Sequence, residues 1–144
     1  MTKKNEFTII AGCGRLGASI AGKLSDRRKD VTVLDCDKTS FRKLPGSYGG
    51  LTMAVSATDM ESLRAAGIEN ATTFIAVTDN DCVNICASQI AKAQFDIPNV
   101  VARIYDEEKT SLVKEMGIET ICPSELSEKE ISTLIRTGGD ADVG

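Results

Sequence analysis

The chain has 144 residues and a formal net charge of −4, from 17 Lys and Arg against 21 Asp and Glu. This acidic balance argues against a general binder of nucleic acid or of anionic membranes, because both need a basic surface. The length predicts one domain, and 42% hydrophobic with 26% charged residues is typical of a globular chain rather than a disordered one.

Short apolar runs alternate with helical patterns along the whole chain, which predicts parallel strands joined by helices. The predicted strands are 7–11, 31–34, 51–55, 74–77, 100–104 and 120–122. Helical segments are predicted after residue 15, at 38–44, up to Ala66, after strand 74–77, at 107–116 and at 124–136. The expected fold is α/β, a Rossmann-like doubly wound, mainly parallel six-stranded sheet with helices on both faces.

Helix boundaries are marked by capping signals. Capping boxes are predicted at 58–61 and 127–130, and Gly67 and Gly117 are expected to end the helices before them. The domain is therefore predicted to span 1–136, and the Gly- and Asp-rich segment 137–144 is predicted to be a flexible tail.

The chain contains no histidine, which removes Ser–His–Asp and Cys–His nucleophilic systems and His-based zinc sites. Its five cysteines include no CxxC pair and are expected to be reduced, mostly buried thiols, with no metal site. The segment before the first strand has no apolar stretch typical of a signal peptide, and no run approaches the ~20 residues that cross a bilayer. We expect a cytoplasmic protein without membrane insertion.

A glycine-rich sequence, Gly-Cys-Gly-Arg-Leu-Gly at 12–17, lies between the first strand and the first helix. This is the context of a dinucleotide fingerprint: Gly12 allows the tight turn, Gly14 the approach of a phosphate, and Gly17 close packing of helix on strand. Asp35, 18 residues after Gly17, is placed to accept hydrogen bonds from ribose hydroxyls and to repel a 2′-phosphate, which disfavours NADP. The alternative is that the glycines only form a tight turn.

Other candidates follow the carboxyl ends of the strands, where open parallel sheets bind ligands. Arg103 ends an apolar strand and needs an anion, either a phosphate or a carboxylate of a partner subunit. Arg15 lies in the glycine loop and is expected to contact an anion. Asn84 is expected either in the same crevice or in a capping or surface role, and Asp37 is interpreted as a solvated turn residue.

These patterns together resemble the N-terminal nucleotide-binding domain (RCK N, or TrkA-N) of Trk/Ktr-type potassium-uptake regulatory subunits. The resemblance runs from about residue 7 to 135 and rests on the sequences IAGCGRLG at 10–17, VLD at 33–35, ATD at 57–59, AVTDND at 76–81 and VAR at 101–103. The family usually has Gly-Asp where this chain has Val55-Ser56, so the carboxylate expected to recognise the adenine edge is missing.

The resemblance implies a cytoplasmic, non-catalytic subunit, peripheral to the membrane through a partner, that binds NAD(H) or an adenine nucleotide (ATP, ADP or AMP). It would assemble into homo-oligomers, from dimer to ring, and gate a membrane potassium-translocating subunit, with 124–136 as a crossover helix on a neighbouring subunit or, alternatively, a plain edge helix. The implied and derived binding residues are Gly12, Cys13, Gly14, Arg15, Leu16, Gly17, Asp35, Cys36, Ser56, Ala57, Thr58, Thr78, Asp79 and Arg103.

Two other functions fit the glycine fingerprint. A small NAD-dependent oxidoreductase would need a positioned acid or base and a substrate pocket, for which the sequence offers no histidine and no Tyr-x-x-x-Lys arrangement. A redox-sensing dinucleotide-binding protein would use Cys13 and Cys36, the first with a thiol pKa lowered by the helix N-terminus. Buried packing is the simpler interpretation of Cys13.

Overall fold

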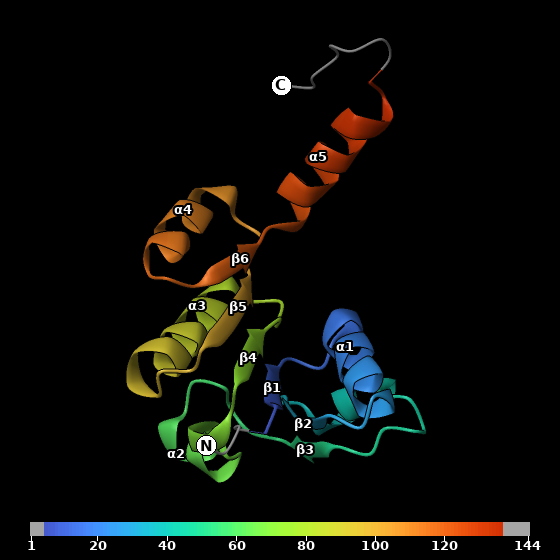
Figure 1. Ribbon diagram of the computed structural model, residues 1–144, viewed down its shortest axis with the longest axis vertical. Helices are drawn as coiled ribbons and strands as arrows, with labels where there is room; N and C mark the ends of the chain where they lie inside the picture. The colour runs from blue at the N-terminus through green and yellow to red at the C-terminus, as the bar shows by residue number, and fades with distance from the viewer. Residues whose placement is uncertain (1–4, 137–144) are drawn as a thin grey trace.

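The computed structural model, which describes residues 5–136, contains one six-stranded, all-parallel sheet with the strand order β3-β2-β1-β4-β5-β6 (Figure 1). The strands are β1 (Phe7–Ala11), β2 (Asp30–Leu34), β3 (Leu51–Met53), β4 (Thr73–Ala76), β5 (Asn99–Arg103) and β6 (Glu119–Ile121). The predicted doubly wound α/β fold is confirmed, and the segment 137–144, predicted to be a flexible tail, lies outside the described residues.

Helices connect each strand to the next. They are α1 (Arg15–Asp26), η1 (Lys38–Lys43), α2 (Met60–Ala65), η2 (Ile68–Asn70), α3 (Asp81–Gln89), η3 (Ile90–Gln94), α4 (Glu107–Glu115) and α5 (Pro123–Leu134). The helix predicted after β4 ends in a π-helical turn, η3, which the sequence pattern did not indicate.

The pleat of the central strands divides the apolar side chains between two layers. Ile9 and Phe74 point into a cluster with α2, α3 and α4, whereas Ile10 and Val33 point into a second cluster with α1 and η1. Both faces of β1 and β4 are therefore covered, which explains why these strands read as continuous apolar runs. The change of face between β1 and β4 places the topological switch point of the sheet there.

Two predicted capping boxes are wrong in detail. At α2 the N-cap is Asp59 rather than Thr58, because the Asp59 carboxylate accepts both the backbone N–H of Ser62 (3.1 Å) and its hydroxyl (2.6 Å). At α5 the helix begins at Pro123, so Ser127 lies inside the helix and caps nothing. A proline at the first helical position has no N–H that needs a partner, and it favours this earlier start.

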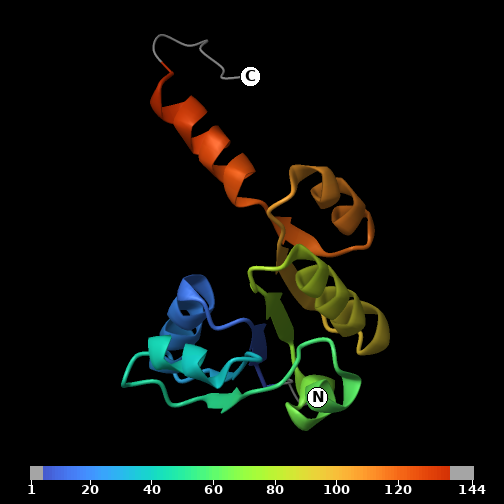
Figure 2. The same cartoon turned by 180° about the vertical axis from the view of Figure 1, so that it is seen from behind.

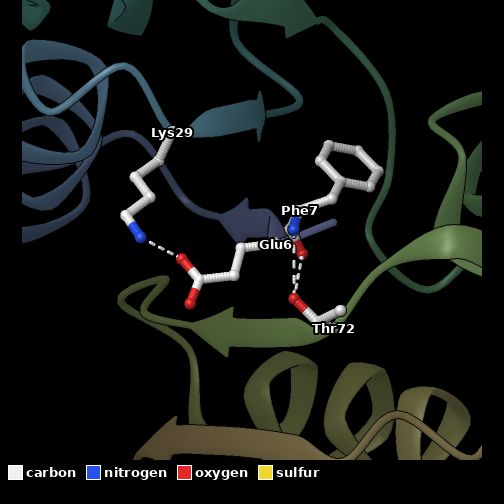
Figure 3. A network of polar contacts seen from close by, with 4 residues as sticks. All are labelled: Glu6, Phe7, Lys29 and Thr72. Carbon is white, nitrogen blue, oxygen red and sulfur yellow. Dashed lines mark hydrogen bonds and ion pairs between the residues drawn. The ribbon is translucent and has the colours of Figure 1, made fainter. Parts of the chain in front are cut away.

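Polar contacts fix the amino-terminal ends of the central strands (Figure 3). The Phe7 N–H donates to the Thr72 hydroxyl (3.0 Å), which in turn donates to the Phe7 carbonyl (3.1 Å), so the entries of β1 and β4 are held together. Lys29, just before β2, forms an ion pair with Glu6. These contacts lie at the opposite end of the sheet from the glycine loop.

α5 extends away from the sheet and has no buried residue (Figures 1 and 2). It exposes Leu126, Ile131 and Leu134, the last of them 73% exposed, and its C-cap residue Ile135 is exposed as well. No described helix is long and apolar enough to cross a membrane.

Tyr48 gives a pH-dependent contribution to stability. Its hydroxyl donates to the Leu51 carbonyl (2.7 Å), and burial raises its pKa to about 12 from an ordinary value near 10. Because the folded state holds the Tyr48 proton more tightly than the unfolded state does, the protonated hydroxyl stabilises the fold. This stabilisation is fully present below pH ~10 and is lost as the pH rises through about 12. We expect the Tm of the parent to fall more steeply between pH ~10 and ~12 than that of Tyr48→Phe, measured by circular dichroism. The exposed Tyr105→Phe should follow the parent, and equal slopes for the parent and Tyr48→Phe would refute this assignment.

Candidate functional site

A cleft of about 450 Å³ lies at the carboxyl ends of β1, β2, β4 and β5, at the switch point of the sheet. Its volume falls within the range of small-molecule sites, and its place is where open parallel sheets bind ligands. Its lining residues are Gly12, Cys13, Gly14, Leu34, Asp35, Cys36, Asp37, Ser40, Lys43, Val55, Ser56, Ala57, Val77, Thr78, Asp79, Asn80, Val83 and Arg103.

The glycine loop forms one wall of the cleft. Gly12 adopts φ +109°, and a Cβ there would lie 2.8 Å from the backbone of Val77 and Thr78, so only glycine fits. Gly14 is the N-cap of α1, has no side-chain cap, and a Cβ on it would meet nothing within 4 Å. The first N–H groups of α1 thus have no capping side chain, a geometry suited to an anion.

Asp35, directly after β2, is held in place by backbone donors on both carboxylate oxygens. Oδ2 accepts from the Cys13 N–H (2.8 Å), and Oδ1 accepts from the Asp37 N–H (2.9 Å). The first bond ties the end of β2 to the glycine loop. Because each carboxylate oxygen has a second lone pair, the half-buried carboxylate keeps acceptor capacity for hydroxyl groups in the cleft.

On the other side of the cleft, Asn84 organises the ends of β4 and β5. Its side chain is fully buried; Oδ1 accepts from the Thr78 N–H (3.0 Å) and hydroxyl (2.6 Å), and Nδ2 donates to the Arg103 carbonyl (2.7 Å). Of the alternatives from sequence, the surface role is wrong because Asn84 is buried, and the place in the crevice is wrong because Asn84 lies outside its lining. Asn84 acts from behind the cleft, by fixing Thr78 and Arg103, and does not line it.

Arg103 is a half-buried cation that lines the cleft and forms no ion pair with a described residue. Its Nη2 donates to the carbonyls of Val77 (2.9 Å) and Thr78 (3.2 Å), and its guanidinium lies 4.9 Å from the centroid of the Tyr105 ring. Nε is buried and has no partner, and Arg103 forms no ion pair with any residue between 5 and 136. A partly buried charge in this state has unmet capacity for an anion.

The structure brings ten of the fourteen predicted site residues into this cleft. The four that do not line it are Arg15, Leu16, Gly17 and Thr58. Arg15 is exposed and lines a separate, shallow groove along α1, so its expected place among the phosphates is not supported by this geometry. Gly17 is buried behind the loop, where a Cβ would lie 1.9 Å from the Gly12 carbonyl oxygen.

Sequence reasoning missed several lining residues on η1 and α3. Lys43 and Ser40 reach the cleft from η1, and Val83 reaches it from the first turn of α3. Asp37, interpreted as a solvated turn residue, is exposed but also lines the cleft and caps η1 by accepting the Thr39 N–H (2.9 Å). These hydrogen bonds from Thr39 lower the pKa of Asp37.

Cys13 does not have the properties of an activated thiol. Its side chain is fully buried, and burial, followed by the nearby negative charge of Asp35, raises its pKa. The prediction that the pKa of Cys13 is lowered, as a redox function requires, is therefore wrong. The alternative prediction, that Cys13 is a buried packing residue, is confirmed. Cys36 lines the cleft and is exposed. Within residues 5–136 no three His, Cys, Asp or Glu side chains are grouped to hold a metal ion.

The family model for the TrkA-N domain matches residues 8–123 of the chain. A curated relative, the Trk system potassium uptake protein TrkA of Streptomyces coelicolor, is 42% identical over 113 residues, which cover 78% of this chain and 51% of that protein. This chain thus spans about half the length of that relative.

Two solved structures have the same fold. The TrkA-N domain of the inner membrane protein ybaL from Escherichia coli superimposes with a TM-score of 0.81 at 18% identity, covering 94% of this chain and all of that one. The GsuK channel bound to NAD superimposes with a TM-score of 0.79 at 16% identity, covering 97% of this chain and 25% of the channel chain.

Proposed function

The chain belongs to the TrkA-N domain family, and from this premise we propose that it is a nucleotide-binding regulatory domain of a potassium transport system. Its ligand is NAD(H) or an adenine nucleotide, bound in the cleft at the carboxyl ends of β1, β2, β4 and β5. The domain acts in the cytoplasm, by binding and not by catalysis.

The observation that carries this proposal is the charge arrangement in the cleft. On one side, Arg103 brings a guanidinium that has no ion-pair partner among residues 5–136. On the other, Asp35 brings a carboxylate with free lone pairs. The glycine loop lies between them at the uncapped start of α1. A nucleotide is the common ligand that needs an anion site and a hydroxyl acceptor within one cleft of this size.

Each part of the cleft has a distinct role in this proposal. The loop at Gly12–Gly14 receives phosphates, Asp35 receives the ribose hydroxyls, and Ala57 flanks the base. Asp35 also disfavours NADP, since a 2′-phosphate would face its charge. Ser56 occupies the place from which relatives are expected to present a carboxylate to the adenine edge, so its hydroxyl makes recognition of the base weaker in this chain.

α5 supplies the contact to other subunits in the same proposal. It exposes Leu126, Ile131 and Leu134 beyond the sheet, and a helix with an unpartnered apolar face is stabilised by burying it. We place a second copy of the domain there, as the first step towards a ring that changes shape with the bound nucleotide. A nucleotide shifts that ring only by the difference between its affinities for two ring shapes.

A titration panel tests the binding function directly. Purified chain is titrated with ATP, ADP, AMP, NAD⁺, NADH and NADP⁺ by calorimetry, and Tm is followed in parallel. At 100 times its Kd a ligand stabilises the fold by about 2.7 kcal/mol, which is large enough to measure. We expect at least one of the first five to bind, and NADP⁺ to bind more weakly than NAD⁺. Absence of binding by all of them would refute the proposal.

Lys43 is predicted to contribute to phosphate binding. It lines the cleft from η1, and its charge is felt both by Cys13 in the glycine loop and by Asp37. Lys43→Ala is expected to weaken ADP binding by about fivefold, in the range of one charge-assisted hydrogen bond at an exposed position, and to leave adenosine binding unchanged. Arg42→Ala is the matched control, because Arg42 neighbours Lys43 on η1 and does not line the cleft. An equal loss for adenosine, or in the control, would contradict the assignment.

A further inference from the structure

The loop between β5 and α4 contacts the cleft on one side and α5 on the other. Its central residue is Tyr105, whose ring lies against the Arg103 guanidinium and is 46% exposed. Asp81, in the first turn of α3, fixes the backbone of this loop: Oδ1 accepts from the Tyr105 N–H (2.8 Å) and Oδ2 from the Asp106 N–H (3.0 Å). The loop is thus anchored to the same helix that contributes Asn80 and Val83 to the cleft.

The first turn of α5 is bonded to this loop. The thiol of Cys122, the N-cap residue of α5, donates to the Tyr105 carbonyl (3.7 Å) and lies 3.4 Å from the Ser124 hydroxyl. That hydroxyl donates to Glu107 at the start of α4 (2.8 Å). Tyr105 therefore contacts a cleft residue through its ring and the start of α5 through its carbonyl. Both contacts belong to one residue of the loop, so a shift of the Tyr105 backbone that accompanies a displacement of its ring would alter the bond to Cys122.

Arg103 is the residue through which a ligand reaches this loop. Within residues 5–136, Nη2 is the only atom of the guanidinium that donates hydrogen bonds, and Nε has no partner. The guanidinium also makes a cation–π contact with the Tyr105 ring. An anion in the cleft competes for the guanidinium with the ring and the two carbonyls. A ligand that draws the guanidinium away from the ring changes the packing of Tyr105. A shift of Tyr105 would in turn change the bond between its carbonyl and the Cys122 thiol.

We infer that Tyr105 positions Arg103 for the nucleotide and couples occupancy of the cleft to the start of α5. The inference rests on the proposed function, since it needs a nucleotide in the cleft. The coupling depends on the aromatic ring of Tyr105, which contacts the Arg103 guanidinium. The hydroxyl of Tyr105 makes no hydrogen bond to a described residue, so Tyr105→Phe keeps the contact and Tyr105→Leu removes it.

Hydrogen exchange tests the coupling. Parent, Tyr105→Leu and Tyr105→Phe are compared with and without NAD⁺ or ADP, each at 20 times its own measured Kd, so that occupancy is equal and a loss of affinity alone has no effect. We expect ligand to change exchange in 119–126 by at least about twofold in the parent and in Tyr105→Phe, and not in Tyr105→Leu. A change that persists in Tyr105→Leu, or that is absent from a ligand-bound parent, overturns the inference.

A double-mutant cycle tests the positioning of Arg103. Tyr105→Leu is expected to weaken nucleotide binding by about two- to fivefold, the strength of one cation–π contact at an exposed position, and Tyr105→Phe to restore it. In an Arg103→Ala background the Tyr105→Leu change should have no further effect on Kd. Additive losses would show that Tyr105 does not act through Arg103. A parent that binds no nucleotide would refute the proposed function and the inference with it, whereas binding without coupling would refute the inference alone.

Discussion

Gly17→Ala is expected to lower the free energy of unfolding by more than about 3 kcal/mol, because the new Cβ would lie 1.9 Å from the Gly12 carbonyl oxygen. Neither group can move far. Gly12 is itself pressed against the backbone of Val77 and Thr78, and Gly17 lies in the first turn of α1. Chemical denaturation measures the loss, and a Tm lower by about 10 °C or more should accompany it.

Gly14→Ala separates this structural role from the role in binding. A methyl group at Gly14 meets no protein atom within 4 Å and would project from a residue that lines the cleft. Because alanine is a poorer N-cap than glycine, the free energy of unfolding should fall by up to about 1 kcal/mol, less than for Gly17→Ala. Nucleotide affinity should fall as well, since the methyl group occupies space that a phosphate needs. If Gly17→Ala folds with parental stability, the close packing of α1 on the glycine loop is wrong; if Gly14→Ala binds nucleotides as the parent does, the phosphates lie elsewhere.

Asp35→Asn is expected to have the largest effect on binding among variants that leave the fold intact. Hydrogen bonds to a charged acceptor contribute about 1.5–3 kcal/mol each, so affinity for NAD⁺ or ADP should fall by about tenfold or more. The asparagine retains an oxygen for one of the backbone donors of Cys13 and Asp37. Calorimetry should also show a smaller ratio between the Kd values for NADP⁺ and NAD⁺ than in the parent, because the charge that repels a 2′-phosphate is gone.

The matched control for Asp35 lies on the same strand. Asp30 begins β2 and is exposed at the amino-terminal end of the sheet, so Asp30→Asn removes the same charge far from the cleft. Its affinity for both ligands should equal that of the parent. Equal losses in the two variants would contradict the assignment of Asp35 as the ribose acceptor.

The sequence was sufficient for features that depend on neighbouring residues. The strand, glycine loop and helix at 7–26 follow from the spacing of glycines and apolar residues within that segment. Asp35 could be placed after the next strand because the short apolar run of that strand ends directly before it. The places of Arg15 and Lys43 depend on tertiary packing instead. Gly17 of α1 packs closely on Gly12, and Arg15 lines a separate groove along α1 rather than the cleft. The short η1, capped by Asp37, brings Lys43 into the lining of the cleft.

The role of Asn84 was also inaccessible from sequence. Its side chain bonds to Thr78, in the turn after β4, and to Arg103, at the end of β5 and 19 residues away. Only the parallel pairing of β4 with β5 brings Thr78 and Arg103 together. The cap at α2 is a different kind of error, since Thr58 and Asp59 are adjacent N-cap candidates and the choice depends on which side chain reaches Ser62.

Amide chemical-shift mapping tests the central claim, that nucleotides bind at the switch point of the sheet. The chain has a second cavity of about 610 Å³ at the amino-terminal ends of β1, β2 and β3, which gives the experiment an internal alternative. Titration of isotope-labelled chain with NAD⁺ or ADP should shift amides at Gly12–Gly14, Asp35–Asp37 and Thr78–Asn80 and leave Asn5, Gly49, Gly50 and Asn70 unchanged. Shifts confined to the second group, or no shifts at saturating nucleotide, would contradict the account.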